Sequence, residues 1–152
     1  MSSTDKRAML RHFLATLAYR GTNVLRDMPE EVQSLRPDPS VRTPIEILGH
    51  INGVLTYAHS HMAEYESTRP PPADWSEEVS GFIAILTRVD ASLRDEVPLT
   101  NVKEEQLLQG PLADAMLHLV QIGIFRRLAG APVEPESYIR APIQIGRIEH
   151  PG

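Results

Sequence analysis

Apolar side chains recur every three or four residues along four separate stretches of the chain. These positions are Met9, Leu10, Phe13, Leu14, Leu17 and Val24; then Ile47, Ile51, Val54, Ala58 and Met62; then Val79, Phe82, Ile83, Leu86, Val89 and Leu93; and last Leu112, Ala115, Leu119, Ile122 and Leu128. This spacing puts apolar side chains on one face of an α-helix, whereas a half-buried strand alternates every second residue. The pattern therefore predicts four amphipathic helices.

Proline positions divide the chain in the same way. The sequence has 13 prolines, and none falls within 1–28, 45–69, 73–97 or 112–131. Proline is excluded from helix interiors because it lacks an N–H and its ring clashes with the preceding turn. Each of these windows is much longer than a typical strand and suits a helix of a bundle. We therefore predict an all-α chain, folded as a single four-helix bundle domain over 1–152.

Residue types at the ends of the windows support these boundaries. Thr43, Pro44 and Glu46 have the order of a capping box with proline at the first helical position. Asp74 can cap the third helix, and Gly130 can close the fourth. The predicted helices cover about 4–28, 44–67, 74–97 and 111–130, with a loop over 99–110 that has room for a short turn at 103–108. The tail, 131–152, is expected to lie extended along the bundle.

Composition places the chain among globular proteins, with 23% charged and 41% hydrophobic residues. The net charge of −5 argues against nucleic acid as the main partner, because phosphate binding needs a basic surface. The absence of cysteine excludes disulfides, thiolate zinc sites and a cysteine nucleophile. The polar start of the sequence and the lack of a long apolar run lead us to expect a soluble, cytoplasmic protein without a membrane segment.

Three polar side chains fall on faces that the pattern makes apolar. His50 lies between Ile47 and Ile51, while Asp114 and His118 are four residues apart and project from one face of the last helix. A carboxylate and an imidazole at this spacing, joined by an imidazole from another helix, can hold a divalent cation inside a bundle. Such a cation would offset the cost of burying an unpaired Asp114. Two histidines and one carboxylate suit zinc, nickel or ferrous iron better than magnesium or calcium.

Plainer interpretations fit the same residues. A histidine on an apolar face is commonly a hydrogen-bonded core residue, and an Asp–His pair at this spacing is commonly a simple ion pair. Glu46, one turn before His50, could be a further ligand or a general base, although its capping role already explains it. Tyr57 is another candidate base, and His59 is expected to face solvent. Spacing alone leaves the metal site and the hydrogen-bonded pair both open.

The chain resembles the DinB-like superfamily in three segments. The last bundle helix of that superfamily is similar to GPLADAMLHLVQIGIFRRLAG at 110–130. Its second helix, which carries an early histidine, is similar to RTPIEILGHI at 42–51. The tail of one subgroup is similar to APVEPESYIRA at 131–141, followed by Gly146 and Arg147. The likeness covers nearly the whole chain in helix order and length.

The resemblance implies an up-down-down-up four-helix bundle, often dimeric, with a long connection between the second and third helices. It also implies a metal held by one histidine of the second helix and two residues four apart on the last. These positions are His50, Asp114 and His118, with the family's following glutamine at Gln121. Asp114 stands where the superfamily usually has a histidine, which puts the metal affinity and the metal preference of the site in doubt. The superfamily commonly has a glycine where this chain has Val120, and the larger side chain limits how closely a neighbouring helix can approach.

The resemblance also implies two classes of function. Characterised relatives include thiol S-transferases and a thiol-dependent isomerase, so the first class is a metal-dependent enzyme that transfers a low-molecular-weight thiol to a small electrophile. The second class is a non-catalytic metal-binding or dimerisation module induced by stress. The expected partner is a second copy of the chain, and a small-molecule substrate belongs to the first class only.

Overall fold

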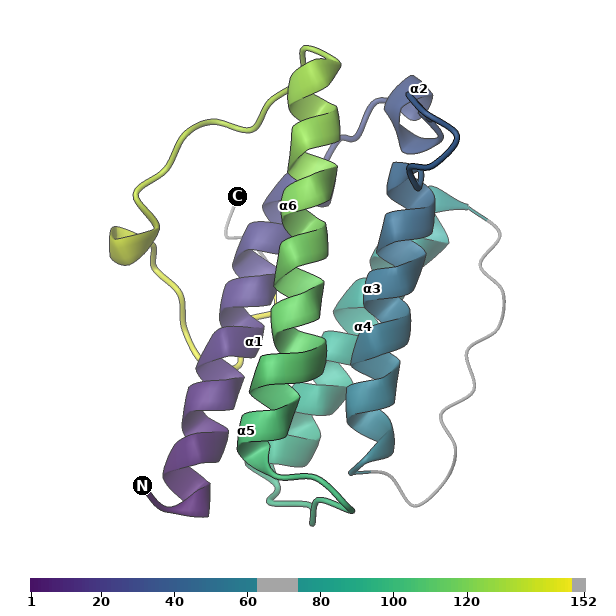
Figure 1. Ribbon diagram of the computed structural model, residues 1–152. Helices are drawn as coiled ribbons and strands as arrows, with labels where there is room; N and C mark the ends of the chain where they lie inside the picture. Colours follow the sequence, from purple (N-terminus) through teal and green to yellow (C-terminus); the bar gives the residue numbers. More distant parts are fainter. Residues whose placement is uncertain (63–73, 149–152) are drawn as a thin grey trace.

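A computed structural model describes residues 1–62 and 74–148, and the regular elements in that part of the chain are all helical (Figure 1). The long helices are α1 (Ser3–Leu25), α3 (Pro44–Ser60), α4 (Trp75–Arg94) and α6 (Ala113–Leu128). The short ones are α2 (Glu30–Gln33), α5 (Glu104–Leu107), a π-helical turn η1 (Leu108–Leu112) and a 3₁₀ turn η2 (Tyr138–Arg140). No strand occurs within those residues, and the all-α prediction is confirmed.

The four long helices pack side by side around one continuous apolar core. Both α1 and α3 contact α4 and α6. Asn52 near the middle of α3 bonds Glu78 near the start of α4, and His59 further along α3 lies beside Ser92 further along α4. These two helices therefore run in the same direction. Figure 1 shows α3 and α4 descending and α1 and α6 ascending.

Capping side chains begin α3 and α4 where the sequence predicts. The Thr43 hydroxyl accepts the Glu46 N–H at 3.3 Å, and Pro44 occupies the first helical position, where its missing N–H costs nothing. The Asp74 carboxylate accepts the Glu77 N–H at 2.9 Å. Each cap satisfies an N–H that has no partner inside the helix, and this fixes the helix start locally.

The helices end earlier than predicted. Asp27 and Glu96 have positive φ angles of 49° and 54°, a conformation that cannot continue a right-handed helix. In α1 the preceding residue, Arg26, is already extended with a ψ of 137°, so α1 ends at Leu25, and α4 ends at Arg94, rather than at 28 and 97. The helix predicted over 44–67 ends at Ser60, and positions 63–67 of that prediction lie outside the described residues.

The start predicted for the last helix, residue 111, is wrong. Helical structure begins at Glu104 and continues through Pro111 into α6. Pro111 lies within the π-helical turn, whose extra residue displaces the carbonyl that the ring would otherwise meet. A proline at this position therefore widens one turn of the helix instead of ending it.

Close approach of α1 and α4 depends on Gly21. A Cβ atom at this position would lie 2.6 Å from the Cζ atom of Phe82, a ring that is fully buried in the core. Only a residue without a side chain allows the ring to lie against the α1 backbone. Gly21 therefore sets the spacing of two helices as well as the place of the largest buried side chain.

The tail after α6 lies against α1 (Figure 1). The Arg20 guanidinium lies 3.8 Å from the centre of the Tyr138 ring, and the Tyr19 hydroxyl donates to the Glu136 carboxylate. Ile148 packs against the core. The sequence predicts an extended tail over 131–152; its described part contacts α1 but contains the 3₁₀ turn η2, and its last four positions lie outside the described residues.

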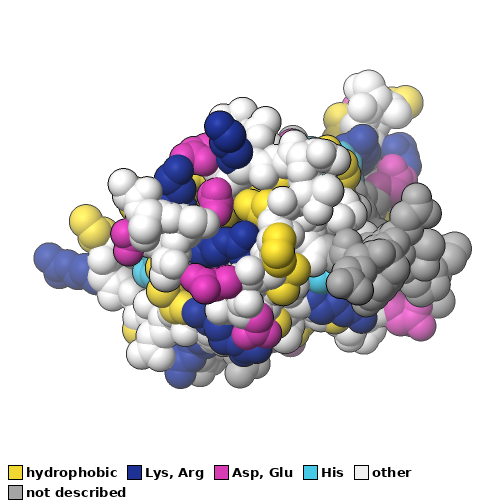
Figure 2. Space-filling view, turned by 90° about the horizontal axis from the view of Figure 1, so that it is seen from below, with side chains coloured by type: hydrophobic (Ala, Val, Ile, Leu, Met, Phe, Trp, Pro, Cys, Tyr) yellow, Lys and Arg dark blue, Asp and Glu magenta, His cyan; other side chains and the backbone are white. Residues whose placement is uncertain are grey.

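Charged side chains of both signs tie the start of α1 to α5. Lys6 Nζ lies 2.5 Å from Glu105 Oε1, and Arg7 Nε lies 3.5 Å from Glu104 Oε1. The Lys6 contact raises the pKa of Lys6 and lowers the pKa of Glu105, chiefly through the hydrogen bond between them. Figure 2 views this end of the molecule and shows acidic and basic side chains interleaved rather than gathered by sign.

The long apolar helix that ends with α6 is only partly covered. Glu104–Leu128 is long and apolar enough to cross a membrane by length and composition, with a mean hydropathy of 1.2 in a window that is 28% buried. Its buried residues, such as Leu112, Leu119 and Ile122, belong to the core shared with the other helices. Its outer face carries the α6 stripe, defined by the exposed residues Leu117, Val120, Ile124 and Leu128.

Candidate metal centre

The three predicted ligands meet between α3 and α6. His50 comes from the first half of α3, and Asp114 and His118 lie one turn apart at the start of α6. Each side chain offers a ligand atom, and these atoms lie within 4.8 Å of one another. Because α3 packs directly on α6, the pairing of distant residues follows from helix packing rather than from a local motif. The group could hold a metal ion.

Hydrogen bonds fix the protonation of one imidazole. His118 Nδ1 lies 2.7 Å from the backbone carbonyl of Asp114, and a carbonyl only accepts, so Nδ1 carries the proton. The lone pair of the His118 ring is therefore on Nε2, the free nitrogen. Metal-binding histidines commonly have this arrangement, with the second nitrogen donating to a carbonyl or carboxylate.

The second imidazole faces the carboxylate directly. His50 Nε2 lies 3.0 Å from Asp114 Oδ2, and the His50 and His118 ring centres are 4.4 Å apart, with planes tilted by 53°. Without an ion, the short distance is an N–H···O hydrogen bond from imidazole to carboxylate. With an ion, the cation takes the place of that proton. The donor set fits a divalent metal of the zinc, nickel or iron type, because it combines two neutral imidazoles with one anionic oxygen.

The site is more open than the sequence predicts. The side chains of His50 and Asp114 are 32% and 40% exposed, while that of His118 is 15% exposed. Asp114 therefore keeps much of its hydration, and the predicted cost of burying it unpaired is not present. The exposure leaves one side of the three residues free for further ligands, as catalytic metal sites require.

An open cavity of about 540 Å³ adjoins His118. Its polar lining includes Arg42, from the segment before α3, and Gln121, one turn after His118. Ile47 and Phe125 supply apolar lining. Of the three candidate ligands only His118 lines this space, which is large enough to admit a small organic molecule.

No family model, no curated protein and no solved structure matches the chain. The resemblance to the DinB-like superfamily therefore stays an expectation, and function has to be argued from the site itself.

The other residues considered as ligand or base do not join the centre. The Glu46 carboxylate binds the Arg36 guanidinium, so only the Thr43 half of the predicted capping box is present. The Tyr57 side chain is 59% exposed and packs edge-on against His61. Among the described residues, neither Glu46 nor Tyr57 forms a hydrogen bond or ion pair with the three candidate ligands, and the sequence-based suggestion of a general base there is not supported.

The sequence pattern predicts that His59 faces solvent, and this prediction is wrong, because the residue is only 8% exposed. Burial lowers its pKa, and the nearby charge of Arg88 lowers it further. Its Nδ1 atom is buried without a hydrogen-bond partner. The pattern places His59 off the apolar face of α3, but Arg88 and Ser92 of α4 lie next to it on this side.

Proposed function

We propose that the chain is a DinB-like four-helix bundle, up-down-down-up in topology, that binds a divalent metal through His50, Asp114 and His118 and uses it in catalysis. The observation that carries the proposal is the convergence of three ligand atoms within 4.8 Å beside an open cavity. The parallel pairing of α3 with α4 supports the topology, and the positions of the three residues agree with the resemblance in the sequence.

The proposed chemistry is transfer of a low-molecular-weight thiol to a small electrophile. A bound divalent cation lowers the pKa of a coordinated thiol and supplies a thiolate near neutral pH. His50 and His118 would hold the ion as neutral imidazoles, and the Asp114 carboxylate would neutralise part of its charge. The thiol sulfur forms the new bond to the electrophilic carbon, its proton leaves to solvent, and the displaced electron pair goes to the leaving group or the opened double bond.

The cavity residues would position the two substrates. Arg42 is an exposed cation and Gln121 a neutral amide, and both line the space next to His118. A carboxylate of either substrate would bind Arg42, and the Gln121 amide would accept or donate one hydrogen bond. Ile47 and Phe125 would exclude water from the apolar part of the electrophile.

Metal content tests the proposal directly. We expect about one zinc, nickel or iron ion per chain after loading and desalting, measured by elemental analysis. The variants His50→Ala and His118→Ala are expected to lose the ion, whereas His12→Ala, which removes an exposed histidine of α1, keeps it. A parent protein that retains no metal after loading and desalting would refute the proposal. An equal loss of metal in all three variants would refute it as well.

The alternative, a non-catalytic metal-binding or dimerisation module induced by stress, is favoured by two observations. The His50–Asp114 hydrogen bond is complete without an ion, and the residues that line the adjoining cavity include no carboxylate that could act as a base. Loaded protein is therefore assayed with small thiols and a chromogenic electrophile such as 1-chloro-2,4-dinitrobenzene. Stoichiometric metal without turnover would favour the module.

We further propose that the protein is a soluble, cytoplasmic homodimer that pairs through the α6 stripe. The stripe residues are between 51% and 73% exposed and follow one line along the helix, and a contiguous exposed apolar surface is typical of an interaction site. Val120 lies on this outer line, so it does not hinder the packing of α6 on its neighbours. Light scattering should give a dimer that Leu117→Glu dissociates and Ile139→Glu, on the exposed tail, does not. A monomeric parent would refute the pairing.

A further inference from the structure

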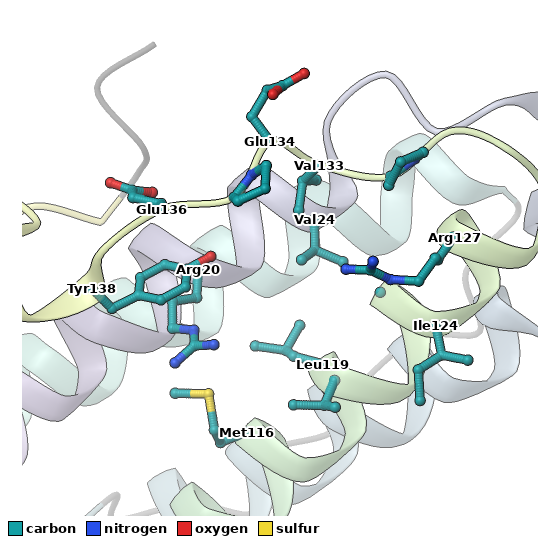
Figure 3. Close-up of a pocket in the computed structure, with 14 residues that line it drawn as sticks. Arg20, Val24, Met116, Leu119, Ile124, Arg127, Val133, Glu134, Glu136 and Tyr138 are labelled. Carbon is teal, nitrogen blue, oxygen red and sulfur yellow. The ribbon is translucent and has the colours of Figure 1, made fainter.

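A second cavity, of about 360 Å³, lies on the flank of α6 opposite the metal centre (Figure 3). Its walls are α1, α6 and the tail that follows α6. The three segments meet here because the tail turns back at Gly130, whose φ of 76° reverses the chain, and then follows α1. None of the three candidate metal ligands lines this space.

The floor of the cavity is apolar. Val24 of α1 and Met116 and Leu119 of α6 provide it, and Figure 3 shows their side chains gathered between the two helices. Leu119 is 2% exposed and therefore rigidly placed in the core. An apolar floor of this kind favours the hydrocarbon part of a ligand, because binding removes both surfaces from water.

Two cations line the same space. Arg20 of α1 and Arg127 of α6 both extend toward the floor in Figure 3. Within the described part of the chain, neither guanidinium forms an ion pair, and Arg20 is held under the Tyr138 ring instead. A guanidinium without a carboxylate partner can bind an incoming anion without first breaking a contact.

Two acidic residues of the tail, Glu134 and Glu136, also line the cavity, at its outer wall. Figure 3 shows Glu134 and Glu136 directed away from the floor, and the Glu136 carboxylate is bound by the Tyr19 hydroxyl. That hydrogen bond raises the pKa of Tyr19, which keeps the hydroxyl as a donor. The side chains directed toward the floor are therefore apolar or cationic, whereas the two carboxylates of the lining point away from it.

We propose that this cavity binds a small organic carboxylate with an apolar body, such as a medium-chain fatty acid. The hydrocarbon chain lies on Val24, Met116 and Leu119, and the carboxylate binds Arg127 or Arg20. The volume is near the lower end of the range for small-molecule sites, which limits the ligand to a short chain or a single ring. The inference does not depend on the proposed metal chemistry, because none of the three metal ligands lines the cavity, whereas Val120 and Ile124 of the α6 stripe lie in its lining.

Methionine methyl groups provide a local probe, since the chain has five methionines and only Met116 lines this cavity. Metal-free protein labelled with ¹³C at the methionine methyls is titrated with sodium octanoate. We expect the Met116 signal to shift with saturation and a Kd on the order of 10⁻⁴ M. The Met9 signal reports on a separate apolar cavity near the start of α1, and its shift instead of the Met116 shift would overturn the proposal.

Two further ligands and three variants separate the contribution of the carboxylate group from that of the hydrocarbon chain. Octanol lacks the charge and inorganic phosphate lacks the body, so each is expected to leave Met116 unshifted at the concentration where octanoate saturates. Arg127→Gln or Arg20→Gln should weaken octanoate about tenfold or more, the larger loss marking the head position. Arg140→Gln, an exposed arginine of the tail outside the lining, should have no effect. Octanol binding as tightly as octanoate, or the same octanoate affinity in all three arginine variants, would refute the assignment. Because Arg127 is exposed, Arg127→Gln tests the site even if Arg20→Gln loosens the contact between the tail and α1.

Discussion

Arg126 offers the sharpest test of how the ends of the helices are held together. Its side chain is 9% exposed, and its guanidinium donates three hydrogen bonds to backbone carbonyls. The acceptors are Val24 and Arg26 at the end of α1, at 3.1 and 2.7 Å, and Ala131 after α6, at 2.9 Å. We predict that Arg126→Met destabilises the protein strongly, although methionine keeps most of the buried hydrocarbon.

The magnitude follows from these three contacts. Hydrogen bonds from a charged donor contribute about 1.5–3 kcal/mol each, and a buried carbonyl left without a donor costs about 1–3 kcal/mol. Burial lowers the pKa of Arg126, so desolvation of the cation offsets part of the gain. Water can also reach the end of α1 once the guanidinium is gone. We therefore expect a net loss of about 2–4 kcal/mol of unfolding free energy, or roughly 5–15 °C in Tm for a chain of this size.

Urea denaturation followed by helix circular dichroism measures this loss, with an unchanged m value as the sign that only stability has changed. The matched control is Arg127→Met. Arg127 is the next residue along α6 but is exposed, so its replacement should change the unfolding free energy by no more than about 0.5 kcal/mol. Equal losses in the two variants would show that helix-dipole charge, and not the carbonyl contacts, accounts for Arg126.

Three further predictions address the packing, the buried histidine and the metal centre. Gly21→Ala should destabilise the protein by about 1–2 kcal/mol, because overpacking against Phe82 exceeds the gain in helix propensity. Gly53→Ala, where a Cβ meets nothing within 4 Å, should instead stabilise it by about 0.5–1 kcal/mol. Chemical denaturation of both variants tests this, and a stabilised Gly21→Ala would contradict the close packing against Phe82. His59 has a lowered pKa from burial first and from Arg88 second, so the unfolded chain takes up a proton near its ordinary pKa before the folded protein does. The stability that neutral His59 provides should therefore be full above its ordinary pKa of about 6.5 and be lost as the pH falls below it, and thermal melts should show a smaller fall for His59→Gln than for the parent or for His12→Gln. Zinc at a hundredfold excess over its Kd should add about 2.7 kcal/mol to the unfolding free energy of the protein, or roughly 5–10 °C to its Tm by differential scanning fluorimetry. This shift should vanish in Asp114→Ala. A parent protein whose Tm is unaffected by zinc, nickel and iron would exclude the site.

The candidate site shows how far residue spacing can be used. Asp114 and His118 share a helix, and their four-residue separation places them on one face without any knowledge of the fold. His50 joins them only because α3 packs on α6, a contact between residues 64 positions apart from His50 to Asp114. The sequence supported this meeting through the apolar neighbours of His50 and through the family resemblance. It overstated the burial of Asp114, since exposure depends on which surfaces of two helices face each other.

Local chemistry determined the helices themselves, because the apolar period and the caps at Thr43 and Asp74 act within a few residues. Tertiary structure decided the features that depend on a distant neighbour. Arg126 and Arg127 look alike in the sequence, yet one is buried against the end of α1 and the other lines a cavity under the tail. Pro111 reads as a helix start, but the helix continues through it as a π-helical turn because the segment packs against α1 and α3. Burial and the meeting of distant side chains are properties of packed surfaces, and these exist only after the helices have assembled.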